Sequence, residues 1–261
     1  MLKVTFLGTG TSQGIPIIGS THPVCLSNNP KDKRLRVSVL LEWDDYCYVI
    51  DCGPDFRQQM LRAEVDRLDG VLITHDHADH TAGLDDIRPF CFRQGPLDFY
   101  ASAEVFKALE NRFGYIFQKQ NKYPGAPSIQ INPIEKNRPF VLQGKTITPI
   151  EAIHFKMPVL GFRLDKFAYL TDVKTLAEDQ IPFLENLDVL VLNALREEEH
   201  PSHLNLEEAL ALVDRLQPKQ TYFTHISHLL GFHEEVSQKL PPHVALAYDT
   251  LSITIPFSDA D

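Results

Sequence analysis

Three imidazoles and two carboxylates fall within six consecutive residues, His75-Asp76-His77-Ala78-Asp79-His80. This cluster directly follows a short apolar run, residues 70–74, which predicts a β-strand. A loop that leaves a strand end can turn all of these side chains inward at once. Imidazole and carboxylate ligands together suit zinc, manganese or iron(II) better than calcium or magnesium. The cluster therefore predicts a transition-metal site and argues against a chance gathering of histidines on a solvated loop.

Four further potential ligands or supporting groups also follow apolar, strand-like runs. Asp51 ends the run 46–51, His154 follows 145–153, Asp172 follows Tyr169-Leu170-Thr171, and His225 follows Tyr222-Phe223-Thr224. Any one of them alone could equally be a cap or turn residue at a strand end. Their repeated position at strand ends favours a shared site.

The elements that must hold these residues alternate between strands and helices. Strands are expected at 2–7, 36–43, 46–51, 70–74, 97–101, 145–153, 159–164, 166–171 and 189–193. Helices are expected at 55–64, 103–112, 173–184 and 206–216, the last with Asn205 as its N-cap. The segment 114–138 lacks periodicity and is expected to be a surface insertion. No linker or repeat divides the chain, so residues 1–261 are expected to form one α/β domain with two central sheets.

Composition narrows the classes of function. Lys and Arg number 25 against 35 Asp and Glu, a formal charge of −10, which disfavours general nucleic-acid binding. Four scattered cysteines give no disulfide scaffold or CxxC pair, which is typical of a cytoplasmic protein. No apolar stretch approaches the roughly 20 residues needed to cross a bilayer, and the first residues do not resemble a secretory signal. A membrane partner is not expected.

The pattern HxHxDH at His75, His77, Asp79 and His80 resembles the signature of the metallo-β-lactamase superfamily. This resemblance covers essentially the whole chain and implies an αββα sandwich that binds two divalent transition-metal ions, zinc or manganese or alternatively iron. It implies that one ion is held by His75, His77 and His154, the other by Asp79, His80 and His225, with Asp172 bridging. A hydroxide formed near neutral pH would be the nucleophile. Asp51 is implied as the residue that orients a ligand histidine.

Within the superfamily, two features indicate the phosphodiesterases. His77 stands where oxygen-reducing di-iron relatives have glutamate, which favours hydrolysis. The segment His200-Pro201-Ser202-His203 resembles an interval of PhnP-like cyclic phosphodiesterases and of tRNA 3′-end nucleases that carries a histidine outside the ligand set. His203 is accordingly predicted to act on the substrate together with Asp172 at the metals. The alternative is that His203 only caps the helix that follows.

A second metal site is also implied by the resemblance. PhnP-like proteins pair a cysteine-rich N-terminal loop with a histidine three residues beyond the last catalytic ligand, which together bind a structural zinc. Here Ser20 and His22 stand where the first two cysteines would be, which leaves His22, Cys25 and His228 as three potential ligands. Because structural zinc normally takes four ligands, the site could bind zinc weakly, recruit another residue or hold none.

The preferred function is hydrolysis of a small phosphodiester, with a 5-phosphoribosyl 1,2-cyclic phosphate as the specific candidate that the resemblance suggests. A second phosphate could meet basic side chains after the histidine cluster: Arg88, Arg93, Arg112, Lys119 and Lys122. The alternatives are a tRNA 3′-processing endonuclease, for which no long basic arm is found, and a lactonase or thioesterase. A non-enzymatic metal- or metabolite-binding module is the remaining alternative. The resemblance also suggests a homodimer, although no sequence feature demonstrates one.

Overall fold

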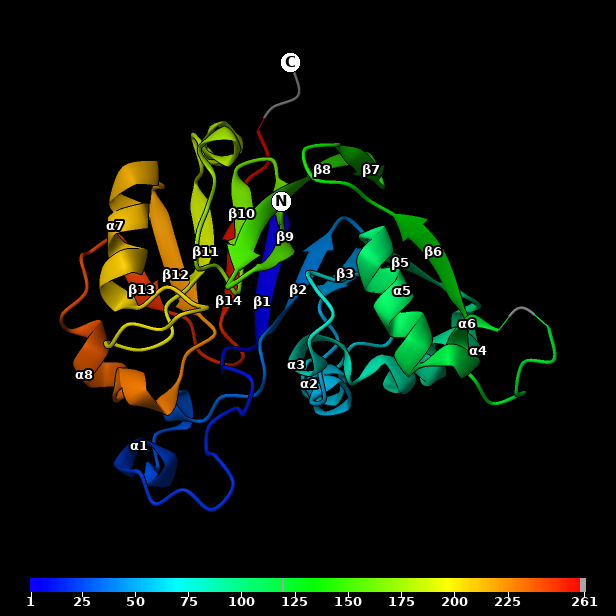
Figure 1. The fold of residues 1–261 in the computed structure, drawn as a ribbon, viewed down its shortest axis with the longest axis horizontal. Coiled ribbons are helices and arrows are strands. Elements are labelled where there is room, and N and C mark those ends of the chain that lie inside the picture. The colour runs from blue at the N-terminus through cyan, green and yellow to red at the C-terminus, as the bar shows by residue number, and fades with distance from the viewer. Residues whose placement is uncertain (119, 259–261) are drawn as a thin grey trace.

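The computed structural model describes residues 1–118 and 120–258, which form two seven-stranded sheets (Figure 1). The first sheet has the order β14-β1-β2-β3-β4-β5-β6, and its last four strands run parallel to one another. Its strands are β1 (Leu2–Gly8), β2 (Ser38–Trp43), β3 (Tyr46–Ile50), β4 (Gly70–Leu72), β5 (Leu97–Ala101), β6 (Ile129–Pro133) and β14 (Ser252–Ile255).

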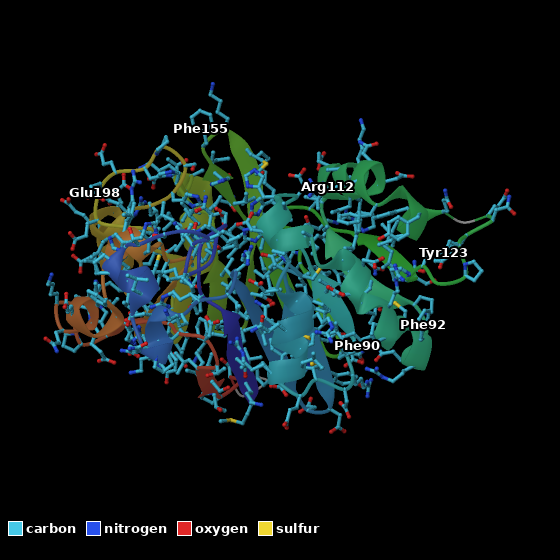
Figure 2. The ribbon with its side chains drawn as sticks, turned by 90° about the horizontal axis from the view of Figure 1, so that it is seen from below. Phe90, Phe92, Arg112, Tyr123, Phe155 and Glu198 are labelled. Carbon is cyan, nitrogen blue, oxygen red and sulfur yellow. The ribbon has the colours of Figure 1, made fainter. Side chains whose placement is uncertain are left out.

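The second sheet has the order β13-β12-β11-β10-β9-β8-β7, with β10 to β13 parallel. Its strands are β7 (Phe140–Leu142), β8 (Lys145–His154), β9 (Met157–Leu164), β10 (Phe167–Leu170), β11 (Val189–Asn193), β12 (Gln220–Thr224) and β13 (Val244–Leu246). The long hairpin of β8 and β9 ends in the two residues Phe155 and Lys156, and its tip projects from the edge of the molecule (Figure 2).

Helices cover the outer faces of the two sheets. They are α1 (Pro23–Leu26), α2 (Phe56–Arg62), α3 (Ala78–Thr81), α4 (Arg88–Gln94), α5 (Ala103–Arg112), α6 (Gly114–Phe117), α7 (Leu206–Leu216) and α8 (His233–Ser237). Short 3₁₀ turns are η1 (Pro30–Asp32), η2 (Leu84–Ile87), η3 (Glu178–Leu184) and η4 (His228–Leu230). Within the described ranges, no helix has the length and apolar character required to span a bilayer.

Successive side chains along each strand point into two different apolar environments, and this alternation builds the layers of the fold. On β3, Tyr48 and Ile50 pack between the sheets, whereas Val49 faces α2, α4 and α5. On β11, Val191 faces the sheet interface, whereas Leu192 packs under α7. Since side chains alternate along a strand, each sheet buries both of its faces. The result is the predicted αββα sandwich, with α7 and α8 at one side of the molecule and α2 to α6 at the other (Figure 1).

Two local predictions were wrong. The expected helix at 173–184 is instead a bend followed by the 3₁₀ turn η3, because Lys174 N–H donates to the Ile153 carbonyl and Val173 N–H donates to the Asn193 side chain. Pro182 also lacks the N–H that a regular helix would use. The segment expected to be only an insertion contains β6, which completes the edge of the first sheet beside β5.

Candidate metal centre

The predicted site residues lie where strands end. Asp51 follows β3, His75 comes three residues after β4, and His154 is the last residue of β8. Asp172 comes two residues after β10 and His225 directly after β12. In parallel strands these carboxyl ends meet at one edge of each sheet, and the sandwich brings the two edges together.

The backbone turns sharply at three of these positions. Asp51, Asp172 and His225 adopt left-handed conformations, with φ of 65°, 59° and 54°. Non-glycine residues rarely occupy this region, and such conformations cost roughly 1–3 kcal/mol each. The surrounding strands impose the conformation, which aims each side chain back toward the gap between the sheets.

One group of side chains converges around the carboxylate of Asp172. Its Oδ2 lies 3.2 Å from His80 Nε2, and its Oδ1 lies 3.3 Å from His225 Nε2. Asp79 Oδ2 lies 3.3 Å and 3.6 Å from the same two nitrogens. Asp79, His80 and His225 thus offer ligand atoms within reach of a single ion, with Asp172 beside them.

The other three histidines adjoin this group. The ring centroids of His75 and His77 are 4.7 Å apart, those of His77 and His154 are 5.1 Å apart, and those of His75 and His154 are 5.7 Å apart. His75 also shares a possible ion position with His80 and Asp172. The structure therefore places all seven predicted ligands in one cluster.

The burial of the donor atoms is a second indication, independent of the sequence pattern, that this cluster suits divalent metals. The Nε2 atoms of His75, His80 and His225 are buried, and none makes a well-aligned hydrogen bond within the described part of the chain, although carboxylate oxygens lie 3.2–3.6 Å from two of them. A buried polar atom without a partner carries a free-energy penalty, so such atoms are normally paired. Three imidazole nitrogens left unpaired beside two carboxylates are arranged as ligands for cations.

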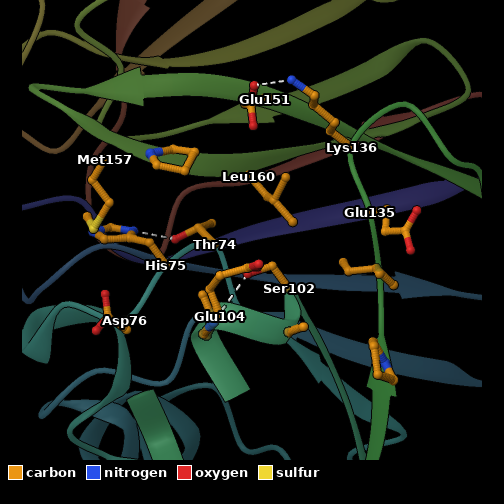
Figure 3. A pocket seen from close by; sticks show the side chains of 15 residues that line it. Thr74, His75, Asp76, Ser102, Glu104, Glu135, Lys136, Glu151, Met157 and Leu160 are labelled. Carbon is orange, nitrogen blue, oxygen red and sulfur yellow. Dashed lines mark hydrogen bonds and ion pairs between the residues drawn. The ribbon is translucent and has the colours of Figure 1, made fainter. Parts of the chain in front are cut away.

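A hydrogen-bond network behind the cluster fixes the histidine tautomers. His80 Nδ1 donates to Asp51 Oδ2 at 2.6 Å. Thr74 Oγ1 donates to the same carboxylate at 2.9 Å and lies 2.9 Å from His75 Nδ1, from which it accepts (Figure 3). Both rings thereby carry their proton on Nδ1 and present Nε2 to the centre. Thr74 was not predicted from the sequence.

We expect Asp51→Ala to weaken binding of a divalent ion by about 10–100-fold, the usual effect of losing a group that orients a ligand histidine. The reason is that His80 would lose the acceptor that fixes its tautomer. Titration of the metal-free protein with zinc, followed by calorimetry, measures the change. Asp44→Ala is the matched control, since Asp44 is an exposed aspartate that also has a positive φ. Equal zinc affinity in the two variants would contradict the role given to Asp51.

The carboxylates and imidazoles shift one another's protonation. Burial alone would lower the pKa of His80, but Asp172, Asp51 and Asp79 outweigh it and raise that pKa well above its usual value. Burial would raise the pKa of Asp172, but His225 and His80 lower it well below the ordinary range. Without a cation, the imidazoles and carboxylates of the cluster therefore favour each other's charged forms. A cation bound there would take over the proton's electrostatic role and displace it.

His203 lies at the edge of the cluster. Its Nδ1 is 3.7 Å from Asp172 Oδ1, and its ring stacks on His225 with centroids 4.8 Å apart. Together with His154 and Asp172 it could also hold an ion, so it is nearer to the ligand set than the sequence indicated. The capping alternative is wrong, because Asn205 is the N-cap of α7 and forms a capping box with Glu208.

The loop before α7 also supports a ligand. His154 Nδ1 donates to the backbone carbonyl of Ser202 at 2.8 Å, which leaves His154 Nε2 to face the centre. Ser202 in turn is held by His200, whose Nδ1 accepts from the Ser202 N–H. No sequence signal pointed to Ser202, because a backbone carbonyl acts without regard to residue type.

The residues of the expected structural zinc site are brought together only in part. His22 and His228 contact each other with ring centroids 4.8 Å apart. His22 Nδ1 accepts from Val24 N–H at the start of α1, which removes that nitrogen as a ligand. Cys25 is buried nearby, yet these three do not form a compact three-ligand group among the described residues. A zinc ion at this position stays a prediction.

Most basic side chains that could meet a second phosphate have other partners. Arg88 pairs with Asp85, and Arg112 hydrogen-bonds the Asp76 carbonyl and Thr81. Arg93 donates to the Asp66 carbonyl and Lys122 to the Ile116 carbonyl. Lys119 lies outside the described residues. These contacts fix the loops around the first sheet and leave little free positive charge there.

Residues 46–226 match the model described as the beta-lactamase superfamily domain, which covers the histidine cluster and the strand-end ligands through His225. The chain belongs to the beta-lactamase superfamily. A solved structure described as a new diphosphatase from the PhnP family is 36% identical, with a TM-score of 0.92, over 98% of this chain and 99% of that one.

Two curated relatives match this chain over only part of their own length. An octanoyltransferase of Porphyromonas gingivalis is 38% identical over 97% of this chain, which spans 52% of that protein. A ribonuclease Z of Methanococcus maripaludis is 31% identical over 43% of this chain and 33% of its own length. This chain thus spans about half, or less, of these relatives.

Proposed function

We propose that this superfamily member is a metal-dependent hydrolase that cleaves a phosphodiester. The observation that carries the proposal is the set of buried, unpartnered imidazole nitrogens around Asp172 and Asp79. His75, His77 and His154 would hold one divalent ion and Asp79, His80 and His225 a second, with Asp172 between them. Ions there would acidify a water from a pKa of 15.7 to about 7 and withdraw charge from phosphate oxygens.

The remaining residues of the chain hold this centre in one arrangement. Asp51 and Thr74 fix the rings of His80 and His75 from the side of the first sheet. The Ser202 carbonyl fixes His154 from the side of the second sheet. Since these three ligand rings are oriented before substrate arrives, less reorganisation is needed during the reaction.

His203 is the residue placed to act on the substrate. Burial, and then the nearby His225, lower the pKa of His203 to about 2, so its ring is neutral in the protein alone. A neutral imidazole still donates one N–H, which can bind a phosphate oxygen where negative charge develops. The approach of an anionic phosphate favours the protonated ring, and that proton can then pass to the departing oxygen.

For the substrate, a small cyclic or sugar-linked phosphodiester such as 5-phosphoribosyl 1,2-cyclic phosphate remains the proposal. The PhnP-family likeness supports it. A second candidate, hydrolysis of an acyl thioester, is favoured by the P. gingivalis relative, whose name gives an octanoyl group. The third candidate is cleavage of a precursor tRNA. The shorter ribonuclease Z match supports it, but the formal charge of −10 opposes it.

A single panel of substrates separates these candidates. The metal-loaded protein is given bis(4-nitrophenyl) phosphate, an octanoyl thioester, a simple lactone and a precursor tRNA, and kcat/KM is measured for each. Turnover of the phosphodiester at least about tenfold above the other three supports the proposal. Preferred turnover of the thioester or the tRNA would replace it, and turnover of none would leave a metal-binding module.

We expect the purified protein to carry close to two transition-metal ions per chain and to lose phosphodiester hydrolysis when they are chelated. The seven clustered ligands are the reason. Elemental analysis before and after EDTA, followed by reconstitution with zinc, manganese or iron(II), measures both effects. Full activity of metal-free protein in excess chelator would contradict the proposed chemistry.

A further inference from the structure

A large cavity opens beside the metal centre, between the two sheets (Figure 3). Its volume of about 670 Å³ lies in the range of roughly 300–1,000 Å³ that small-molecule sites occupy. It begins at Thr74 and His75, just after β4, and extends between the start of α5 and the end of β6 on one side and the start of β9 on the other. Because His75 is one of the proposed ligands, a group bound in this cavity would adjoin a phosphate held at the metals.

The wall of this cavity is mainly aliphatic. Val105, Ile134 and Leu160 form its buried part, each at most 8% exposed, and Figure 3 shows the Leu160 side chain lying between the two sheets. Met157 and Pro158 add further apolar surface from β9. Among the described residues, no phenylalanine, tyrosine or tryptophan lines the cavity. Without an aromatic face on which a flat ring could stack, this wall favours an aliphatic group.

The charged side chains around the cavity are mostly paired. Three of its four carboxylates form ion pairs: Asp76 with Arg112, Glu135 with Arg138, and Glu151 with Lys136. The fourth, that of Glu104, is exposed to solvent. Lys136 is the one lysine or arginine among the described lining residues, so no free cation of this kind is left for a second phosphate. The cavity therefore suits an uncharged group.

The hydroxyl groups of the wall are also engaged. Ser102 Oγ accepts from the Val105 N–H at the start of α5. Thr74 Oγ1 donates to Asp51 and accepts from His75 Nδ1. A hydroxyl-bearing group would leave water for a wall with few free hydrogen-bond partners, and burying a hydroxyl without a partner is unfavourable. The wall thus favours an apolar group over a sugar.

We propose that one of the two groups joined by the substrate's phosphodiester is an alkyl chain, and that this chain occupies the cavity while the phosphate lies at the metals. Of the proposed substrates, this selects a sugar-linked diester over a cyclic one, with the sugar on the other side of the phosphate. A second cavity, of about 470 Å³, adjoins the ligands His77 and His154 and leaves room for that group. This inference rests on the proposed phosphodiester chemistry and specifies one part of its substrate.

The first test uses phosphonates, which lack an ester bond that the protein could hydrolyse. Methylphosphonate and n-butylphosphonate are titrated into the metal-loaded protein by calorimetry. Each methylene that leaves water contributes up to about a fourfold gain in affinity, so butylphosphonate is expected to bind at least about tenfold more tightly. Equal affinity for the two ligands would overturn the proposal.

A matched ligand, 3-hydroxypropylphosphonate, separates chain length from polarity. It is as long as butylphosphonate but ends in a hydroxyl in place of a methyl group. It is expected to bind at least about fivefold more weakly than butylphosphonate, because its hydroxyl finds few free partners in the wall. An equal or higher affinity for the hydroxyl ligand would show that the cavity takes a hydroxyl-bearing group such as a sugar, and would overturn the proposal.

Two variants test whether the chain lies in this cavity. Leu160→Phe adds volume from β9, and Ala103→Leu adds volume at the first residue of α5. Each should reduce the preference for butylphosphonate over methylphosphonate to about threefold or less. The melting temperature and metal content should be kept, because the added atoms enter open space and do not overpack the core. A variant that keeps these two properties together with the full preference would show that the chain binds elsewhere, and would overturn the proposal.

Two exposed positions with the same residue types provide matched controls. Leu61→Phe lies on α2, where Leu61 is 63% exposed, and Ala211→Leu lies on the exposed face of α7. Neither residue lines the cavity, so both variants should keep the full preference for butylphosphonate. A loss of preference in these controls as large as in Leu160→Phe would mean that filling the cavity is not the cause, which also counts against the proposal.

Turnover distinguishes failure of this inference from failure of the proposed function. When a 4-nitrophenyl alkyl phosphate is hydrolysed, the water oxygen bonds to phosphorus and 4-nitrophenolate leaves with the electron pair of the broken bond. The protons of water pass to the alkyl phosphate or to solvent. The kcat/KM of the butyl diester should exceed that of the methyl diester by at least about tenfold. Equal cleavage of both diesters, with equal binding of the two alkylphosphonates, overturns the inference and leaves the proposed function standing. Cleavage of neither by the metal-loaded protein overturns the proposed function, and the inference with it.

Discussion

Asp172→Ala should leave at most one bound divalent ion per chain and lower phosphodiester hydrolysis by roughly a thousandfold or more. The carboxylate of Asp172 offers one oxygen to the His80 side of the cluster and the other to the His225 side. A water molecule cannot supply the negative charge that holds two cations close together. Losing one cation removes several kcal/mol of charge stabilisation from the transition state, which sets the size of the effect.

Elemental analysis and kcat on the same preparation measure the two effects together. Asp172→Asn separates charge from shape, because it keeps the side-chain size and removes the negative charge. Asp44→Ala controls for placing alanine at a positive φ, since Asp44 has φ of 51° and lies in an exposed turn. If Asp172→Ala retains both ions and its rate, the bridging role is wrong, whatever the outcome for Asp44.

The ligand positions could be predicted because each depends on a local feature. His75, Asp172 and His225 each come at or soon after the end of a short apolar strand, and such strands are recognisable from composition alone. The parallel pairing of β10, β11 and β12 then brings the last two of these ends to one edge. Strand ends thus favoured a shared site, and the resemblance of the HxHxDH pattern to the metallo-β-lactamase signature supplied the full ligand set.

The supporting residues could not be predicted because they depend on long-range register. Thr74 reaches Asp51 only because β3 and β4 pair with Ile50 opposite Leu72. Ser202 acts through its backbone carbonyl, which carries no residue signature. The strands expected at 145–153 and 159–164 left a connection between them, but Phe155 and Lys156 are not usual turn residues, so nothing marked them as a two-residue hairpin loop. Each of these features required the folded arrangement to be seen.

His203→Ala should lower kcat on a phosphodiester by roughly 10²–10⁴-fold, the range for losing a positioned proton donor or a group that stabilises developing charge. The buried Nδ1 of His203 has no hydrogen-bond partner within the described residues, so it is available to a substrate oxygen. Its low pKa, set first by burial, means that the free ring donates as a neutral imidazole until phosphate binds. KM should change less than kcat, because the interaction strengthens as charge moves onto the leaving oxygen.

The metal content of the His203→Ala variant decides how its loss of kcat is interpreted. His203 also lies within reach of His154 and Asp172, so loss of an ion from His203→Ala would show that it acts as a ligand instead. His203→Gln retains a hydrogen-bond donor but cannot transfer a proton, so partial activity in this variant indicates charge stabilisation and none indicates proton transfer. His200→Ala is the comparison within the same loop, since His200 accepts from Ser202. A kcat on the phosphodiester that His203→Ala leaves unchanged would remove this residue from the mechanism and weaken the phosphodiesterase proposal with it.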